Sequence, residues 1–214
     1  MGTNHGVRPR RGRPRDPDAE PRIRRYAVQL LLERGFDGMT VDDVAEAAGV
    51  GKATIYRRWA SKEQLANDAL ADLFDIEIPD ADTGSIAGDL RQVYYDALKF
   101  VNSKEGLALI RLAVSEATRD ERSATIYRAF LERRIQLTEA ALARARARGE
   151  PVRSNVDTTL VVQWLAGVFV IRALTGEDMP TPEDADRLLM FTMRCVMDDG
   201  SGPDPGAESN SVHG

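Results

Sequence analysis

The sequence is poor in the residues on which most enzyme active sites depend. Its only cysteine is Cys195, and its only histidines, His5 and His213, lie near the two ends of the chain. One cysteine excludes an intrachain disulfide and suits a reducing cytoplasm, and these counts together exclude the usual zinc-ligand sets. The run Gly49–Gly51 is too short for a phosphate-cradling glycine loop. We therefore expect no catalysis, no metal and no other cofactor.

Long apolar runs are also missing. The most apolar stretch, Leu160–Leu174, is interrupted by Gln163 and Arg172 and is shorter than the ~20 residues that a membrane-spanning helix requires. The N-terminal arginines are not followed by an apolar segment, as they would be in a secretory signal. The sequence therefore predicts a soluble, cytoplasmic protein with no membrane partner.

Charge is unevenly distributed along the chain. Residues 1–66 carry 13 Lys or Arg against 9 Asp or Glu, whereas the remainder carries 16 against 25. A basic N-terminal region on an acidic body is typical of a nucleic-acid-binding domain attached to a unit with another role. Residues 1–15 contain five arginines, Arg13 and Arg15 among them, and no acidic residue. We interpret this segment as a flexible arm that contacts phosphates or a minor groove; the alternative is a solubilising tail or an appended sequence.

Residues 40–62 have the pattern of a helix-turn-helix. Thr40 is a suitable N-cap for a short amphipathic helix, and Gly49 stands where a helix ends in a left-handed residue. A second short helix, from about residue 51 to 59, presents Ile55 inward and polar or aromatic side chains on its other faces: Lys52, Thr54, Tyr56 and Arg57. The second helix of such a motif enters the DNA major groove. The alternative is an ordinary helical hairpin.

The rest of the chain predicts an all-α fold, with apolar residues at helical spacing and no β pattern. A first helix should begin near Asp18 and end at Gly35, and Ser61 should cap a helix that runs to about Asp75. A hinge is expected at residues 77–82, where prolines and acids break the pattern. Body helices are expected at residues 84–102, 106–118, 123–148, 156–175 and from Thr181 to about 198. The predicted divisions are an arm at 1–17, a DNA-binding domain at 18–66, a ligand-binding and dimerisation domain at 67–199, and a disordered tail at 200–214.

The last two helices are more apolar than a single buried stripe requires. Residues 156–175 leave almost no polar face, so this helix must be buried on every side. It either lies at the centre of its own bundle or packs against a second subunit; we favour a four-helix dimer contact, with plain core packing as the alternative. Arg172 should need a carboxylate partner or a water-exposed end. The expected interface residues are Val161, Leu165, Val168, Phe169, Arg172, Leu189, Met193 and Val196.

A ligand cavity is also expected between helices of the body. Aromatic walls with one charged anchor are typical of small-molecule pockets. Each candidate residue has an alternative role in simple core packing or on the surface. The candidates are Tyr94, Tyr95, Phe100, Arg111 and Trp164.

The motif resembles the tetracycline-repressor (TetR) family of bacterial transcription regulators. The usual family run A-G-V-S-x-x-T-[LI]-Y-x-x-F-x-S-K-x-x-L is matched by A-G-V-G-K-A-T-I-Y-R-R-W-A-S-K-E-Q-L, and the preceding G-R-P-R is also common there. The body resembles one of the C-terminal domain types of the family, less specifically, through L-A-G-V-F-V-I-R-A-L-T-G. The resemblance implies a homodimer with nine or ten helices per chain: an N-terminal three-helix helix-turn-helix domain and a C-terminal helical domain that binds an inducer.

The resemblance also assigns residue roles by position. Thr40, Tyr56 and Lys62 would contact phosphates, and the recognition helix would present four residues to the groove: Lys52, Ala53, Thr54 and Arg57. Gly51 replaces the common Ser or Thr, which removes a side-chain cap. Trp59 replaces the common Phe, which should enlarge the packing.

These observations predict a ligand-responsive transcriptional repressor. It would bind double-stranded DNA at a palindromic operator as a dimer and be released by a small-molecule inducer. One alternative is a transcriptional activator of the same family. Another is an all-α protein-interaction module, which would show no salt-dependent DNA binding. A small-molecule enzyme on a helical bundle is disfavoured by the residue counts above.

Overall fold

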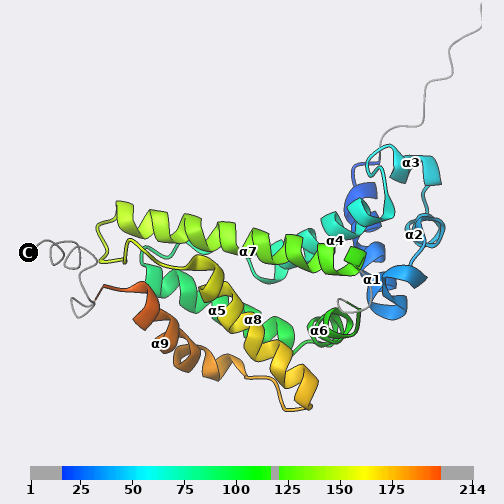
Figure 1. Cartoon of the computed structure of the whole chain (residues 1–214). Coiled ribbons are helices and arrows are strands. Elements are labelled where there is room, and N and C mark those ends of the chain that lie inside the picture. The colour runs from blue at the N-terminus through cyan, green and yellow to red at the C-terminus, as the bar shows by residue number, and fades with distance from the viewer. Residues whose placement is uncertain (1–15, 117–120, 199–214) are drawn as a thin grey trace, which may run out of the picture.

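The computed structural model describes residues 16–116 and 121–198, where the regular elements are helices joined by loops and one isolated β-bridge links Val152 and Met197 (Figure 1). The all-α prediction is therefore confirmed. The predicted tail at 200–214 and Arg13 and Arg15 of the arm lie outside the described residues. The helices in these ranges are α1 Ala19–Gly38, α2 Val41–Ala48, α3 Lys52–Tyr56, α4 Lys62–Glu77, α5 Ile86–Val101, α6 Lys104–Glu116, α7 Glu121–Ala147, α8 Thr158–Thr175 and α9 Ala185–Val196, with a 3₁₀ turn at Pro182–Asp184.

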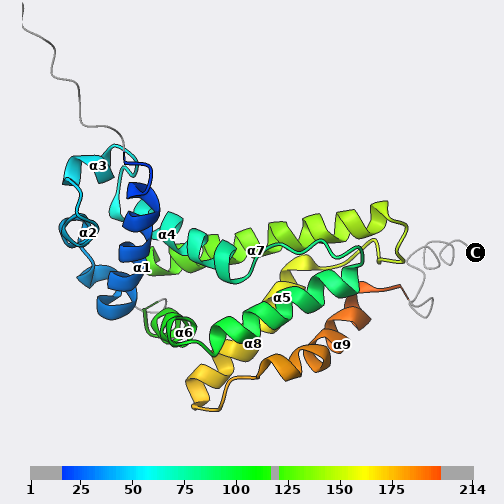
Figure 2. The ribbon, with the colours of Figure 1, turned by 180° about the vertical axis from the view of Figure 1, so that it is seen from behind.

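The helices form an elongated molecule with two ends. Helices α1, α2 and α3 gather at one end and α9 lies toward the other, while α7 runs along much of the length between them (Figures 1 and 2). We call residues 18–66 the head and the remaining helical part the body. Helix α4 begins in the head and packs on both α1 and α7, so it is the physical link between the two.

Helix α1 forms because apolar residues repeat along one face, which is buried against α2 and α4. The expected end at Gly35 is only partly right. Gly35 has φ 74° and ψ 174°, which interrupts the helical geometry, but one further turn continues to Gly38. Glycine tolerates this positive φ without a Cβ clash, and the kink turns Phe36 into the head core, where it is buried.

One continuous apolar core runs from the head into the body. In the head it contains Ile55, Trp59 and Leu65, and it continues without a break to Leu98 and Leu142. Further along α4, the ring of Phe74 stacks on Phe130 of α7 at 3.8 Å and meets Phe100 of α5 edge-on at 5.7 Å. A displacement of α4 therefore changes packing in both parts of the molecule.

The segment between α4 and α5, where a hinge was expected, is held by arginines of α7. The buried Arg134 guanidinium donates to the Ile78 carbonyl at 2.8 Å. Arg144 donates to both carboxylate oxygens of Asp80 at 3.1 Å and to the Ala81 carbonyl at 2.8 Å. Bidentate guanidinium–carboxylate pairs are geometrically specific, so these contacts fix the path of the segment along α7.

Close packing of α5 and α6 depends on Gly106. An added Cβ at this position would overlap the Phe100 carbonyl oxygen and lie 2.7 Å from its carbonyl carbon. Backbone cannot move aside as a flexible side chain can, so we expect Gly106→Ala to lower the free energy of unfolding by about 1–3 kcal/mol. Urea unfolding at a fixed protein concentration measures this loss.

The matched control is Gly51→Ala. Nothing lies within 4 Å of a Cβ added at Gly51, and its φ of −73° is accessible to alanine. Alanine is a poorer N-cap than glycine, but it also restricts the unfolded chain, which stabilises the fold by about 0.4–1 kcal/mol. The two effects oppose, so this variant should change stability by less than about 0.5 kcal/mol. Equal losses in the two variants would contradict the packing role of Gly106.

Candidate nucleic-acid interface

The helix-turn-helix forms from strong local signals. Thr40 caps α2, with its Oγ1 accepting from the Asp43 amide at 3.1 Å. Gly49 ends the helix in the left-handed region, at φ 65° and ψ 35°. The next residue, Val50, returns its amide to the Ala45 carbonyl at 3.0 Å, the hydrogen bond of a Schellman turn. The predicted cap and turn are therefore confirmed.

Helix α3 lies at the outer edge of the head, away from the body (Figure 1). It spans Lys52–Tyr56, shorter than the predicted 51–59. Arg57 still has right-handed helical angles, and the amide of the buried Trp59 donates to the Ile55 carbonyl at 2.9 Å, so a single turn carries the chain on from α3. Gly51 occupies the N-cap and supplies no side-chain hydrogen bond, as expected. Only Ile55 of α3 is buried, so the remaining side chains are available to a partner.

The predicted groove residues lie on this outer edge. Lys52 and Ala53 are exposed and Thr54 is half-buried. The Lys52 ammonium lies 2.8 Å from an Asp42 carboxylate oxygen and 5.8 Å from the centre of the Tyr56 ring. The hydrogen bond to Asp42 raises the pKa of Lys52, which keeps the ammonium charged. Both members of this ion pair are exposed, and such a pair exchanges for another anion at little cost.

Two arginines follow α3 and differ in their partners. Arg58 forms an ion pair with Glu20 of α1 at 3.0 Å. The Arg57 side chain is exposed, and no ion pair holds it to another of the described residues. Arg57 is therefore the cation beside α3 that is most available to DNA.

Three polar contacts in the head were not anticipated from the sequence. The Trp59 indole nitrogen donates to Asp68 of α4 at 2.7 Å, and Arg22 of α1 donates to the Ala48 carbonyl at the end of α2 at 2.8 Å. Lys62 donates to a backbone carbonyl of α1, that of Phe36, although it was expected at a phosphate. Their partners lie 9 to 26 residues away in sequence, beyond the reach of helix-periodicity arguments.

The five predicted ligand-pocket residues do not line one cavity among the described residues. Tyr94 and Phe100 are buried in the core, whereas Tyr95 and Arg111 are exposed. The Tyr94 hydroxyl lies 2.6 Å from the Thr192 hydroxyl, and burial raises the pKa of Tyr94 to about 12 against the smaller opposite effect of this hydrogen bond. The five positions differ in burial and do not share one side of the body, so their common role in a ligand pocket stays a prediction.

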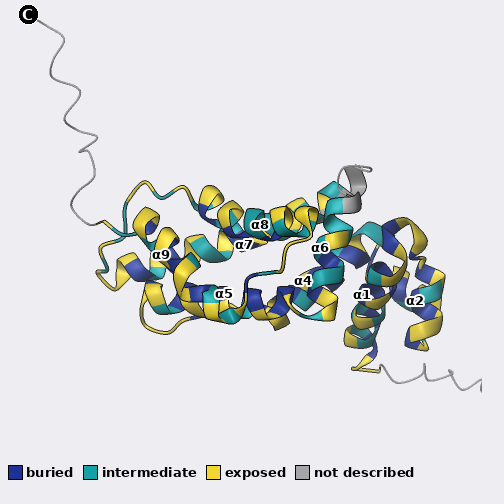
Figure 3. Ribbon diagram, turned by 90° about the horizontal axis from the view of Figure 1, so that it is seen from below, coloured by how far each residue is buried: buried dark blue, intermediate teal, exposed yellow. Residues whose placement is uncertain are grey.

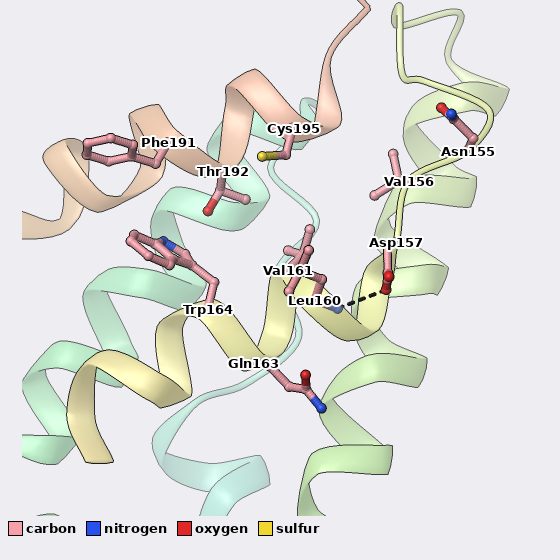
Figure 4. A pocket seen from close by; sticks show the side chains of 10 residues that line it. All are labelled: Asn155, Val156, Asp157, Leu160, Val161, Gln163, Trp164, Phe191, Thr192 and Cys195. Carbon is pink, nitrogen blue, oxygen red and sulfur yellow. Dashed lines mark hydrogen bonds between the residues drawn. The ribbon is translucent and has the colours of Figure 1, made fainter. Parts of the chain in front are cut away.

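Trp164 is the one member of that set that borders a hollow. The hollow has a volume of about 430 Å³ and lies between α8 and α9. Figure 4 shows Trp164 on one side and Phe191 on the other, and their ring centres are 5.9 Å apart. The hollow also includes Leu160, Thr192 and Cys195, so it opens on an apolar surface of the chain.

The predicted dimer-interface residues differ in how far their own chain buries them, and the interface itself stays a prediction. Five of the eight are buried in the core of their own chain and offer almost no surface to a second subunit: Val161, Leu165, Phe169, Leu189 and Val196. Val168, Arg172 and Met193 are half-buried. The side chains that these helices expose are different ones, and they give α8 and α9 the exposed outer sides seen in Figure 3. They are Leu160, Trp164, Val170, Ile171, Leu174, Met190 and Phe191.

Four exposed apolar residues of α8 and the half-buried Gly167 form a regular stripe. Leu160, Trp164, Gly167, Ile171 and Leu174 are spaced alternately by four and three residues, the spacing of a coiled-coil seam. Nothing in the chain lies within 4 Å of a Cβ added at Gly167, so this glycine also faces open space. An apolar stripe with this spacing is typical of a helix that packs against another helix, here one from a second subunit.

Arg172 lies on α8 beside this stripe and has its expected partners. Its guanidinium donates to the Asp178 carbonyl at 2.6 Å and lies 3.8 Å from a Glu177 carboxylate oxygen. The predicted need for a partner is therefore confirmed.

Two protein-family models match the chain. The tetracyclin repressor-like C-terminal domain matches residues 80–191, which is more than half of the sequence, and the model of bacterial regulatory proteins of the tetR family matches residues 23–69. The chain belongs to the TetR family. The resemblance carried by the helix-turn-helix thus extends to the body.

Similar proteins agree with this assignment. The TetR-family chain is 35% identical over 173 residues to the uncharacterized HTH-type transcriptional regulator YdeS of Bacillus subtilis (strain 168), covering 79% of this chain and 86% of YdeS. It is 35% identical over 172 residues to the HTH-type transcriptional regulator AqdR of Rhodococcus erythropolis, covering 79% and 82%. Among solved structures, the TetR family transcription regulator SCO0332 superposes with a TM-score of 0.66 at 25% identity, covering 85% of this chain and 100% of that one.

This TetR-family protein is a DNA-binding transcriptional regulator and not an enzyme. No group of three or more potential metal ligands occurs in the described part of the chain. Within that part, α8 alone is long and apolar enough to cross a membrane, with a mean hydropathy of 1.5 over 18 residues. This is weak support for a membrane span, because a packing helix of a soluble regulator has the same composition.

Proposed function

We propose that the protein is a dimeric repressor that binds a palindromic operator and is released by a small-molecule inducer. This proposal is supported by two exposed surfaces: α3 presents basic and hydroxyl side chains at the edge of the head, and α8 presents an apolar stripe. The first suits the DNA major groove and the second suits a second copy of the chain. Such a regulator acts in the cytoplasm, where the operator is.

The DNA contacts that we propose divide into two kinds. Lys52, Ala53, Thr54 and Arg57 face the groove, where cations and hydroxyls read base edges. Thr40 and Tyr56 flank them and contact phosphates, which position the head without reading sequence. Gly51 lets the DNA backbone approach the start of α3, and Arg13 and Arg15 of the arm add phosphate or minor-groove contacts.

The inducer would act through α4. A ligand that favours one body conformation shifts α4, because the Phe74 ring packs on α5 and α7 and the arginines of α7 hold the segment after α4. A shift of α4 in both subunits alters the separation of the two heads. Operator affinity would then fall by the coupling free energy, typically about 1–3 kcal/mol.

The effect of Arg57→Ala tests the DNA interface. The probe is a DNA duplex selected from a random library by the parent protein, and binding is followed by fluorescence anisotropy. Loss of a bidentate base contact should weaken binding about 5- to 150-fold, corresponding to about 1–3 kcal/mol, and relax sequence preference at one position of each half-site.

The control for this prediction is Arg91→Ala. Arg91 lies on α5 of the body, where it pairs with Asp186 at 2.6 Å, so its loss should leave operator affinity unchanged. If Arg57→Ala binds as tightly as the parent, Arg57 does not contact bases. If the parent protein selects no duplex and shows no salt-dependent binding, the proposed function is wrong.

A further inference from the structure

Cationic side chains from two neighbouring helices bracket the ends of α2. Lys62, the first residue of α4, donates from Nζ to the Phe36 carbonyl at 2.8 Å, and its ammonium lies 4.2 Å from the centre of the Phe36 ring. Arg22 of α1 donates from Nε to the Ala48 carbonyl at 2.8 Å, and its Nη2 lies 2.8 Å from Asp16. Both cations are half-buried.

Both acceptors lie at the C-terminal end of a helix. The last four carbonyls of an α-helix have no amide partner within the helix, and this end carries partial negative charge that a cation stabilises. Phe36 lies in the last turn of α1, and Ala48 is the last residue of α2. Lys62 therefore holds the junction before α2, and Arg22 holds the junction after it.

The orientation of α3 depends on these junctions. It has five residues and buries only Ile55, so its own packing constrains it weakly. The turn that begins at Ala48 leads directly into α3. We propose that Lys62 and Arg22 are positioning residues: by fixing both ends of α2, they set the orientation in which α3 meets DNA. This inference rests on the proposed DNA-binding function.

Lys52 shows what a lysine available to DNA looks like in the same domain. It is exposed, and among the described residues it contacts Asp42 and the face of Tyr56. Lys62, in contrast, would have to leave both a carbonyl and an aromatic ring of α1 to reach a phosphate. We therefore assign the two lysines opposite roles, although the resemblance placed Lys62 at a phosphate.

Matched substitutions of the two lysines separate these roles. Lys62→Met and Lys52→Met each remove an ammonium and keep an unbranched apolar side chain. Hydrogen exchange of residues 36–40 is followed without DNA, and affinity for the selected duplex is followed across a salt series. Lys62→Met should speed exchange at 36–40 and weaken binding about tenfold without changing the slope of log affinity against log salt.

Lys52→Met should show the reverse pattern. Exchange at 36–40 should stay at the parent rate, and the salt slope should shrink by about 0.9, the value for one phosphate or groove cation lost from B-DNA. The proposal is overturned if Lys62→Met leaves exchange at 36–40 unchanged, or if it lowers the salt slope by the same amount as Lys52→Met.

Arg22→Met tests the other end of α2 and carries the proposal if Lys62→Met does not fold. It should speed exchange at residues 48–51, again with weaker binding and an unchanged slope; unchanged exchange there refutes the role of Arg22. Protection of α5, remote from the head, reports whether each variant is folded. If the parent protein binds no duplex, the proposed function fails, while the exchange measurements, made without DNA, still decide whether the two cations hold the helix ends.

Discussion

The variant Ile171→Asp is expected to be a folded monomer that binds the operator at least about 100-fold more weakly than the parent protein. Ile171 belongs to the α8 stripe and is 61% exposed in the single chain, so aspartate there should cost the protomer little stability, as surface substitutions usually do. In a dimer across the stripe, the same carboxylate would be buried without a partner, at a cost of several kcal/mol. Two heads that bind together gain about 10²–10⁴ in affinity over one, and the monomer loses this gain.

The matched control is Ile76→Asp. Ile76 is 67% exposed on α4, so the same substitution is made at an equally exposed isoleucine outside α8 and α9. Sedimentation equilibrium should show a dimer for Ile76→Asp and a monomer for Ile171→Asp. Gly167→Arg places a charge at the centre of the stripe, where the chain itself leaves room, and should also be monomeric. A dimeric Ile171→Asp with parent affinity would exclude this face as the subunit contact.

The exposed face of α8 shows where sequence reasoning stops. The sequence predicts that α8 is apolar on all sides, but the choice of side that faces the protomer depends on α6, α7 and α9. Val161, Leu165 and Phe169 form one stripe, and Leu160, Trp164 and Ile171 form the other. Both are apolar, so hydrophobicity cannot rank them. The spacing by four and three residues was the available signal, because it marks a seam between helices.

The helix-turn-helix was predictable for the opposite reason. Thr40, Asp43 and Gly49 act on neighbours within a few residues, so each signal is complete within the motif. The residues next to Lys62 in the sequence do not show what it binds, because its hydrogen-bond acceptor lies 26 residues away. The family resemblance assigned Lys62 a phosphate contact from its position in the motif alone, without the contacts that surround it in the folded chain. The pocket prediction has the same limit, because a cavity depends on how several helices rotate against one another.

Trp59→Ala is expected to lower the free energy of unfolding by about 3–5 kcal/mol, the usual cost of emptying a large buried site. The Trp59 side chain is 1% exposed between α3 and α4. Trp59→Phe restores the common family residue and fills most of this volume, so it should cost only about 0.5–1.5 kcal/mol, the net value of a hydrogen bond. Urea unfolding followed by circular dichroism, at one protein concentration because a dimer is expected, measures both.

The hydrogen bond itself can be isolated with Asp68, which accepts from the Trp59 indole nitrogen at 2.7 Å. Asp68→Asn keeps an oxygen acceptor and should be nearly neutral, whereas Asp68→Ala should cost about as much as Trp59→Phe. The double variant Trp59→Phe/Asp68→Ala should then cost little more than either single one, because both remove the same interaction. Additive losses would show that the bond contributes nothing and that the tryptophan acts by volume alone. A small loss in Trp59→Ala would mean that α3 and α4 close over the site, and α3 would then no longer be held at the angle that the DNA contacts require.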